Sequence, residues 1–312
     1  MDLIESLGDP TLTVGLSNAA IYAKLENGEW SDALRWSQRV IDLADGDPSK
    51  GNFIVKSPLA RAFTTRATAR WCLGRPGWQD DLRHGLAMAR SADAMAYAGV
   101  VSWVYGLGIL TGALGPDDSA VREIEDALRI AGRSSDDVAV TVARMTLGVA
   151  LVHRHMAAER DRGQKLLAEV SEMFREYFLA ELPIVDVYLA RERARRGDPD
   201  DAIPRMRTAV EDLFREGQLG SGVLATDVLV ETLLDRGADA DVAEAEAAIE
   251  RLAAAPADEG LVIREIWLLR LWALLARARG DAAAYAHFRD RYRDMAKTLG
   301  FDGHIGWAEA MP

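Results

Sequence analysis

The 312-residue sequence has very little cysteine, and Cys72 is the only one. A single cysteine cannot form an internal disulfide, and this usage is typical of proteins from a reducing compartment. Cys72 lies between Trp71 and Leu73, in a segment whose apolar residues have helical spacing. We therefore expect a buried structural thiol rather than a reactive one.

Positive charge is also scarce. The chain has 37 lysines and arginines against 49 aspartates and glutamates, which gives a formal net charge of −12. Binding to the phosphates of nucleic acids requires a basic surface. The sequence therefore predicts no nucleic-acid partner.

Signals for export and for membrane insertion are missing from the sequence. Acidic rather than basic residues follow Met1, which does not fit a secretory signal peptide. The longest apolar tract, residues 263–276, is interrupted by three charged residues and is too short to span a bilayer. We therefore expect a cytoplasmic protein with no membrane partner.

The common motifs for catalysis and cofactor binding do not occur. Gly74 and Gly77 enclose an Arg-Pro turn, but no lysine follows that could contact a phosphate. His153 and the histidine two positions later point to different faces of an expected helix, which does not favour a metal site. Aspartate pairs such as Asp117 and Asp118 fall at expected helix starts, where they are typical caps. The sequence predicts no catalytic residue, no cofactor and no metal ion.

What the sequence does contain is a series of paired helical segments separated by turns. At Gly197 a charged helix ends, and a second helix starts at Asp198 and continues with apolar residues at helical spacing. The turns of other pairs contain the glycines Gly77, Gly115, Gly237 and Gly280. Gly77 and Gly115 are 38 positions apart, Gly197 and Gly237 are 40 apart, and Gly237 and Gly280 are 43 apart. A period in this range, with two helices per unit, is typical of helical solenoids.

These features predict an all-α fold, namely a tetratricopeptide-like α-α superhelix of about seven helical hairpins. The whole chain is expected to form one domain, with a lead-in over 1–13, repeats over 14–299 and a capping tail over 300–312. In the fourth unit, the polar stretch 158–162 is expected to be the turn between the two helices. The apolar tail residues Phe301, Ile305 and Trp307 are expected to cover the exposed face of the last hairpin.

In such a stack the first helix of each hairpin faces the concave surface, which commonly binds a peptide or a partner domain. The expected register places eight residues on this surface: Asn18, Tyr22, Tyr105, Met145, His153, Arg191, Arg270 and Arg277. We expect this surface to bind a protein, a peptide or a small effector. Alanine changes at Arg191, Arg270 and Arg277 should then weaken binding without altering stability.

Three stretches of the sequence carry a resemblance to a known group of proteins. Residues 33–60, 260–281 and 299–312 are similar to the C-terminal helical-repeat region of large bacterial signalling proteins. Those proteins combine an adenylate/guanylate cyclase domain, an AAA/STAND-type ATPase domain and tetratricopeptide-like repeats, and some end in a LuxR-type DNA-binding domain. The cyclase aspartates and the Walker loop are absent here, so the resemblance transfers no active-site residue. It implies a repeat region alone, which is expected to sense a ligand or partner and to hold the ATPase in a resting state.

Two other functions stay open at the level of sequence. The chain could be an enzyme with a small-molecule pocket inside the superhelix, which an activity assay would reveal. It could also be a scaffold that associates with copies of itself, because the ends of solenoids can stack. The leading interpretation is a non-catalytic interaction and regulatory module.

Overall fold

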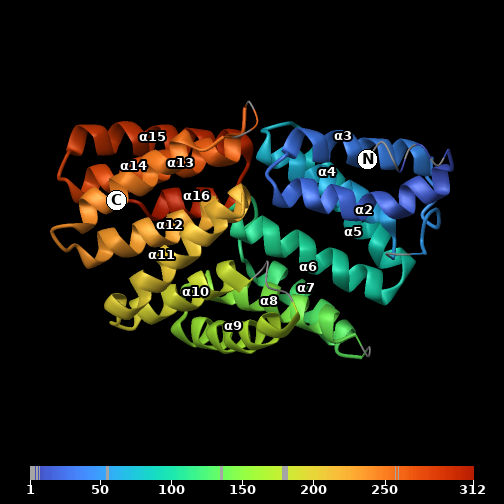
Figure 1. Ribbon diagram of the computed structural model, residues 1–312, viewed down its shortest axis with the longest axis horizontal. Coiled ribbons are helices and arrows are strands. Elements are labelled where there is room, and N and C mark those ends of the chain that lie inside the picture. Colours follow the sequence, from blue (N-terminus) through green and yellow to red (C-terminus); the bar gives the residue numbers. More distant parts are fainter. Residues whose placement is uncertain are drawn as a thin grey trace.

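The computed structural model describes residues 4, 6, 8–53, 56–133, 136–177, 182–256, 258 and 260–312. Over these residues it contains fifteen helices, α2 to α16, and no β-strand (Figure 1). The prediction of an all-α fold is confirmed.

The helices form seven consecutive hairpins followed by one short helix. The hairpins are α2 (Pro10–Glu26) with α3 (Trp30–Ala44), α4 (Pro58–Cys72) with α5 (Trp78–Ala92), α6 (Ala94–Leu110) with α7 (Asp118–Ala131), α8 (Asp137–Val152) with α9 (Ala157–Tyr177), α10 (Leu182–Arg195) with α11 (Pro199–Arg215), α12 (Leu219–Arg236) with α13 (Asp241–Ala254), and α14 (Val262–Ala278) with α15 (Ala282–Leu299). The last helix is α16 (Asp302–Ala310). Buried apolar residues from all seven hairpins join into one core cluster.

Aspartates begin several of these helices, as the sequence indicates. Asp117 Oδ1 accepts a hydrogen bond from the backbone N–H of Ala120 at 2.8 Å, which caps α7. Asp9 caps α2 in the same way, with Thr11 N–H donating at 2.7 Å and Pro10 in the first turn. Helix α2 therefore starts before the expected lead-in ends, because the cap and the proline together start it at Pro10.

The turn expected at 158–162 is wrong. Helix α8 ends at Val152, and α9 already begins at Ala157 and continues through the polar stretch. The stretch is misleading because polar residues occur on the exposed face of a helix as well as in turns. Gly163 follows the stretch and lies within α9. A Cβ at this position would lie 2.9 Å from the carbonyl oxygen of Gly148, so the glycine allows α9 to pack closely on α8 and does not mark a turn.

The seven hairpins curve until the two ends of the array meet, where the sixth hairpin touches the first and the seventh touches the second. The first helix of each hairpin packs against the first helix of the next, and α12 and α14 also contact α2 and α4 (Figure 1). At this junction the Ser31 N–H, in α3, donates a hydrogen bond to Asp258 before α14 at 2.7 Å. The expected open concave groove is therefore replaced by an interior that the chain closes around.

The C-terminal tail packs on α15 of the last hairpin, where Arg293 donates to the Ala308 carbonyl at 3.0 Å, and it also enters this interior. Asp302 N–H donates to the Ala113 carbonyl at 3.2 Å, and His304 N–H donates to the Gly112 carbonyl at 3.1 Å. Gly112 has a φ of 71°, and a Cβ there would lie 2.7 Å from the rings of His304 and Trp307. The tail thus ties the seventh hairpin to the turn after α6, and Phe301 and His304 are completely buried.

Candidate binding cavity

A cavity of about 520 Å³ lies inside the closed array. Its wall receives residues from the first helix of every hairpin, α2, α4, α6, α8, α10, α12 and α14. Sites for small molecules have volumes of roughly 300–1,000 Å³. The cavity therefore has a size that suits a small ligand, and it occupies the place where an open solenoid would have its concave groove.

One face of α6 follows the cavity over the whole length of the helix. Met95, Gly99, Trp103, Gly106 and Leu110 all line it, at intervals of three or four residues. At 1.5 Å per residue this stripe is ~22 Å long. The cavity is therefore elongated along α6.

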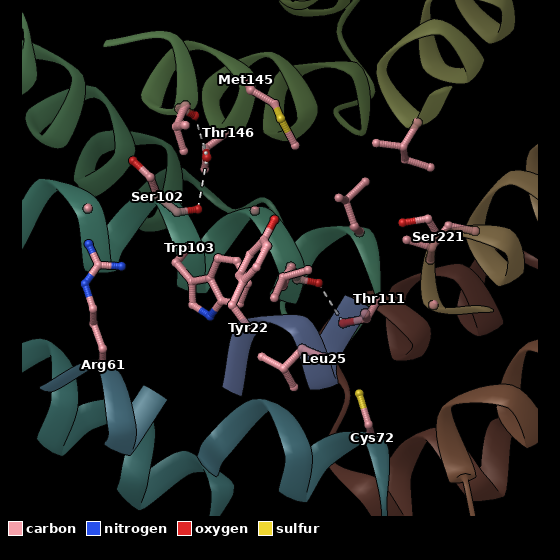
Figure 2. Close-up of a pocket in the computed structure, with 18 of the residues that line it drawn as sticks. Tyr22, Leu25, Arg61, Cys72, Ser102, Trp103, Thr111, Met145, Thr146 and Ser221 are labelled. Carbon is pink, nitrogen blue, oxygen red and sulfur yellow. Dashed lines mark hydrogen bonds between the residues drawn. The ribbon is translucent and has the colours of Figure 1, made fainter. Parts of the chain in front are cut away.

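Most of the wall is apolar or aromatic. The rings of Tyr22 on α2 and Trp103 on α6 pack with centroids 5.2 Å apart, and both border the cavity (Figure 2). Met145 of α8 lies across from them, and Trp267 of α14 contributes to the wall as well. Such a surface favours the apolar part of a ligand.

Two hydroxyls of the wall already donate hydrogen bonds to backbone carbonyls. Thr111 donates to the Leu107 carbonyl at 2.8 Å, and Thr146 donates to the Ser102 carbonyl at 3.0 Å (Figure 2). These hydroxyls therefore add little polarity to the interior.

Arg61 of α4 is the exception. Its Nε is buried without a hydrogen-bond partner, and over the described part of the chain its guanidinium makes no ion pair. Burial lowers the pKa of the Arg61 guanidinium from its ordinary value. The side chain extends from α4 into the cavity (Figure 2), and a Cβ at Gly99 would lie 2.9 Å from its Nη2.

The cavity reaches the surface on the side of Arg61. Lys56, Asp136 and Val138 line the cavity and are exposed, and Val138 retains 47% of its surface. Asp136 also caps α8 by accepting from Ala139 N–H at 3.0 Å. Among the described residues of the wall, this mouth carries one positive and one negative side chain, and neither is paired with Arg61.

Cys72 lies on the cavity wall at the C-terminal end of α4, with its Sγ directed toward the interior (Figure 2). The residue is fully buried, and burial raises the pKa of the thiol well above its ordinary value. The expectation of a buried thiol is confirmed, and a protonated thiol is a poor nucleophile.

A second polar cluster lies next to the tail. The Arg270 guanidinium pairs with Asp227 and Glu231 of α12, and it lies 5.5 Å from the centre of the Trp267 ring and 5.4 Å from that of Trp307. Burial raises the pKa of Asp227, although the Arg270 charge opposes this. Here the protein itself supplies the counter-charges of a buried arginine.

Arg191 and His153 extend this cluster. Arg191 donates to the Val152 carbonyl at 3.0 Å, and its guanidinium lies 4.5 Å from the centre of the Tyr188 ring. The ring of His153 packs on Tyr188 with centroids 5.1 Å apart. Burial, with Arg191 nearby, lowers the pKa of His153 well below its ordinary value.

The eight residues expected on the concave surface do not come together. Tyr22 and Met145 line the cavity, and Asn18 is half-buried on α2. Tyr105 donates to Glu123 of the outer helix α7 at 2.6 Å, and Arg277 is exposed.

His153, Arg191 and Arg270 belong to the second cluster. Arg191 and Arg270 are only 6% and 8% exposed. The expectation that alanine changes at these two residues leave stability unaltered is corrected by this burial, because each would remove a charge from a packed polar network.

Arg61 and Trp103 are two of the many cavity residues that the sequence patterns did not indicate. A weak signal exists for Arg61. Arg66 and Arg70 are four positions apart on one helical face and both pair with Asp81, at 2.5 and 2.7 Å. Arg61 is five positions before Arg66 and therefore lies on a different face, which the α4 sequence alone could have indicated.

Three further findings bear on function. In the described ranges, no group of three or more histidine, cysteine, aspartate or glutamate side chains is placed to hold a metal ion. None of the helices described is long and apolar enough to cross a membrane. A scan against protein-family models finds no match to this chain, and a search of curated proteins finds none either.

Proposed function

We propose that this chain is a non-catalytic regulatory module that binds a small effector in its central cavity. The observation that carries this proposal is the enclosure of a cavity of about 520 Å³ by the first helices of all seven hairpins. A ligand at this position touches both ends of the array at once. Its binding therefore favours the closed arrangement over any state in which the junction between the ends is open.

A small effector fits this arrangement better than a peptide or a partner domain does. The two ends of the array are in contact, through α2 with α12 and α4 with α14, and α16 fills part of the interior. A folded partner would therefore meet the outer surface and not the concave one. We infer that such a partner binds the outer surface, and that its binding depends on whether the effector is bound inside. A cyclase/ATPase domain of the kind that the resemblance implies is an example.

The composition of the wall supports binding over catalysis. Among the described residues that line the cavity there is no histidine, and the one carboxylate, Asp136, caps a helix at the mouth. The thiol of Cys72 is held in its protonated form. This wall offers no nucleophile paired with a general base.

A cavity-filling variant tests the proposal. A Cβ at Gly106 would meet only the Thr146 hydroxyl, at 3.4 Å, so Gly106→Leu should fold with its side chain in the cavity. The glycine is inside α6, where its replacement adds up to ~1 kcal/mol of helix propensity. Gly106→Leu should therefore retain the thermal midpoint and lose the stabilisation that small apolar or amphipathic compounds give the wild type.

Gly306→Leu is the matched control, because Gly306 also lies in a helix and a Cβ added there would meet nothing within 4 Å. It should respond to the compounds as the wild type does. Thermal midpoints of the three proteins are measured with and without each compound. A compound that stabilises the wild type and Gly106→Leu equally binds elsewhere, and that result would count against the central cavity as the effector site.

A further inference from the structure

Arg61 differs from the other arginines of its helix in having no counter-charge. Arg66 and Arg70 share Asp81, whereas the guanidinium of Arg61 points into the cavity and forms no hydrogen bond or ion pair within the described part of the chain (Figure 2). Moving a charge out of water without a partner is unfavourable. An anionic group of a ligand would supply the missing partner.

The position of Arg61 along the cavity indicates where that group would be. Its Nη2 lies against Gly99, near the beginning of α6 and close to the mouth. From there the α6 stripe continues past Trp103 to Leu110, and Trp267 of α14 also lines the cavity. The cavity thus has a charged end and a long apolar end, which is the distribution of polarity in an extended amphipathic molecule.

The amount of charge distinguishes between anions. One guanidinium carries one positive charge. Lys56 and Asp136, both exposed at the mouth, have opposite charges and together add no net charge. A carboxylate matches a single guanidinium in charge and can accept two parallel hydrogen bonds from it. A phosphate dianion would leave part of its charge without a partner.

We propose that the effector is a long-chain monocarboxylate, bound with its carboxylate on the Arg61 guanidinium and its apolar chain along α6. This inference rests on the proposed function, because it assigns the chemistry of the ligand in the same cavity. It makes Arg61 the residue that determines specificity for the acid.

The probes are four compounds with the same twelve-carbon chain: dodecanoate, dodecanol, dodecylamine and dodecyl phosphate, each kept below the concentration at which it forms micelles. Calorimetry and tryptophan fluorescence measure their dissociation constants, since Trp103 borders the cavity. A hydrogen-bonded charge pair in a shielded site should favour dodecanoate over dodecanol by on the order of 10- to 100-fold. Dodecylamine should bind weakest, and dodecyl phosphate more weakly than dodecanoate.

Arg61→Met is the decisive variant, since methionine keeps an unbranched apolar side chain and removes the charge. It should bind dodecanol as the wild type does and lose the preference for dodecanoate. Arg75→Met is the control, because Arg75 is an exposed arginine in the turn after α4. It should keep the preference.

The outcomes separate this inference from the proposed function. Equal binding of acid and alcohol by the wild type, or equal weakening of both in Arg61→Met, overturns the role of Arg61 and leaves a cavity that binds small molecules. Tighter binding of dodecyl phosphate overturns the choice of a carboxylate. Binding that survives in Gly106→Leu is not in the cavity and overturns the inference together with the proposed function.

Discussion

Two arginines of this protein, the buried Arg270 and the half-buried Arg61, are surrounded in opposite ways. Arg270 lies between Asp227 and Glu231, and two tryptophan rings cover the guanidinium. Arg61 extends into a cavity where neither a carboxylate nor a hydrogen-bond acceptor of the described chain meets it. The two arginines therefore have different roles. The charge of Arg270 stabilises the packing of helices within the protein, and the charge of Arg61 is available to a ligand.

The most severe test of this contrast is Arg270→Met. The change leaves Asp227 and Glu231 next to each other without their counter-charge, and Asp227 is only 6% exposed. Breaking a buried pair from one side costs about 3–5 kcal/mol. Urea unfolding should show a loss of stability of this size.

A surface pair gives the control for Arg270. Arg279 pairs with Glu246 on the exposed side of the last two hairpins, and such pairs contribute about 0–1 kcal/mol. Arg279→Met should change stability by no more than that. If Arg270→Met costs as little as Arg279→Met, Arg270 is not the structural arginine that its surroundings indicate.

The pH dependence of stability refines the picture of the Arg270 region. His304 is completely buried there, with its ring 2.9 Å from the Tyr292 hydroxyl and 3.0 Å from the Thr111 carbonyl. Burial, reinforced by the charge of Arg270, lowers the pKa of His304 to about 3. The unfolded chain, in which a histidine has a pKa of about 6.5, therefore binds more protons between these values, and folding weakens as the pH falls below about 6.5.

Between pH 6.5 and pH 5 the contribution of His304 to this loss should be about 2 kcal/mol, at about 1.4 kcal/mol per pH unit. His304→Gln keeps a donor for Thr111 and an acceptor for Tyr292, and it should flatten the dependence by that amount. The pH dependence of stability that remains in this variant includes the contribution of His153, because burial lowers the pKa of His153 as well. Urea unfolding of both proteins at several pH values gives the measurement. Parallel curves of stability against pH would mean that the pKa of His304 is not lowered by folding.

The smallest expected effect is at Arg61, and its sign is opposite. Arg61→Met removes a half-buried guanidinium that has no counter-charge among the described residues, so the protein without ligand should become more stable, by about 1 kcal/mol. Thermal and urea unfolding of ligand-free protein check this, with Arg75→Met as the neutral reference. A loss of stability in Arg61→Met would show that the guanidinium has a structural partner, and the two arginines would then be alike.

Much of the hairpin series is readable from local patterns. Gly197, Gly237 and Gly280 lie in turns between helices, and Asp117 caps a helix as its position indicates. The turn expected at 158–162 was misplaced, because a run of polar residues occurs on the exposed face of a helix as well as in a turn. The start of α2 was misplaced for a related reason, since Pro10 is compatible with a turn and with a first helical position.

The candidate site was far less predictable. Only Tyr22 and Met145 of the eight expected surface residues line the cavity, although all eight lie on, or directly after, first helices of hairpins. Local periodicity indicates which face of a helix is apolar, but the curvature of an array depends on small rotations added over all of its units. Whether Arg270 faces water or a pair of carboxylates depends on the total rotation that the units of the array add up to.

The order of residues along the chain was enough to specify helices, their pairing into hairpins and an all-α fold, because these depend on contacts between residues near in sequence. The meeting of α2 and α4 with α12 and α14 depends on contacts between residues more than 150 positions apart. So does the position of the tail against Gly112. These distant contacts close the array and enclose a cavity, in which Arg61 has no partner among the residues that the structure describes.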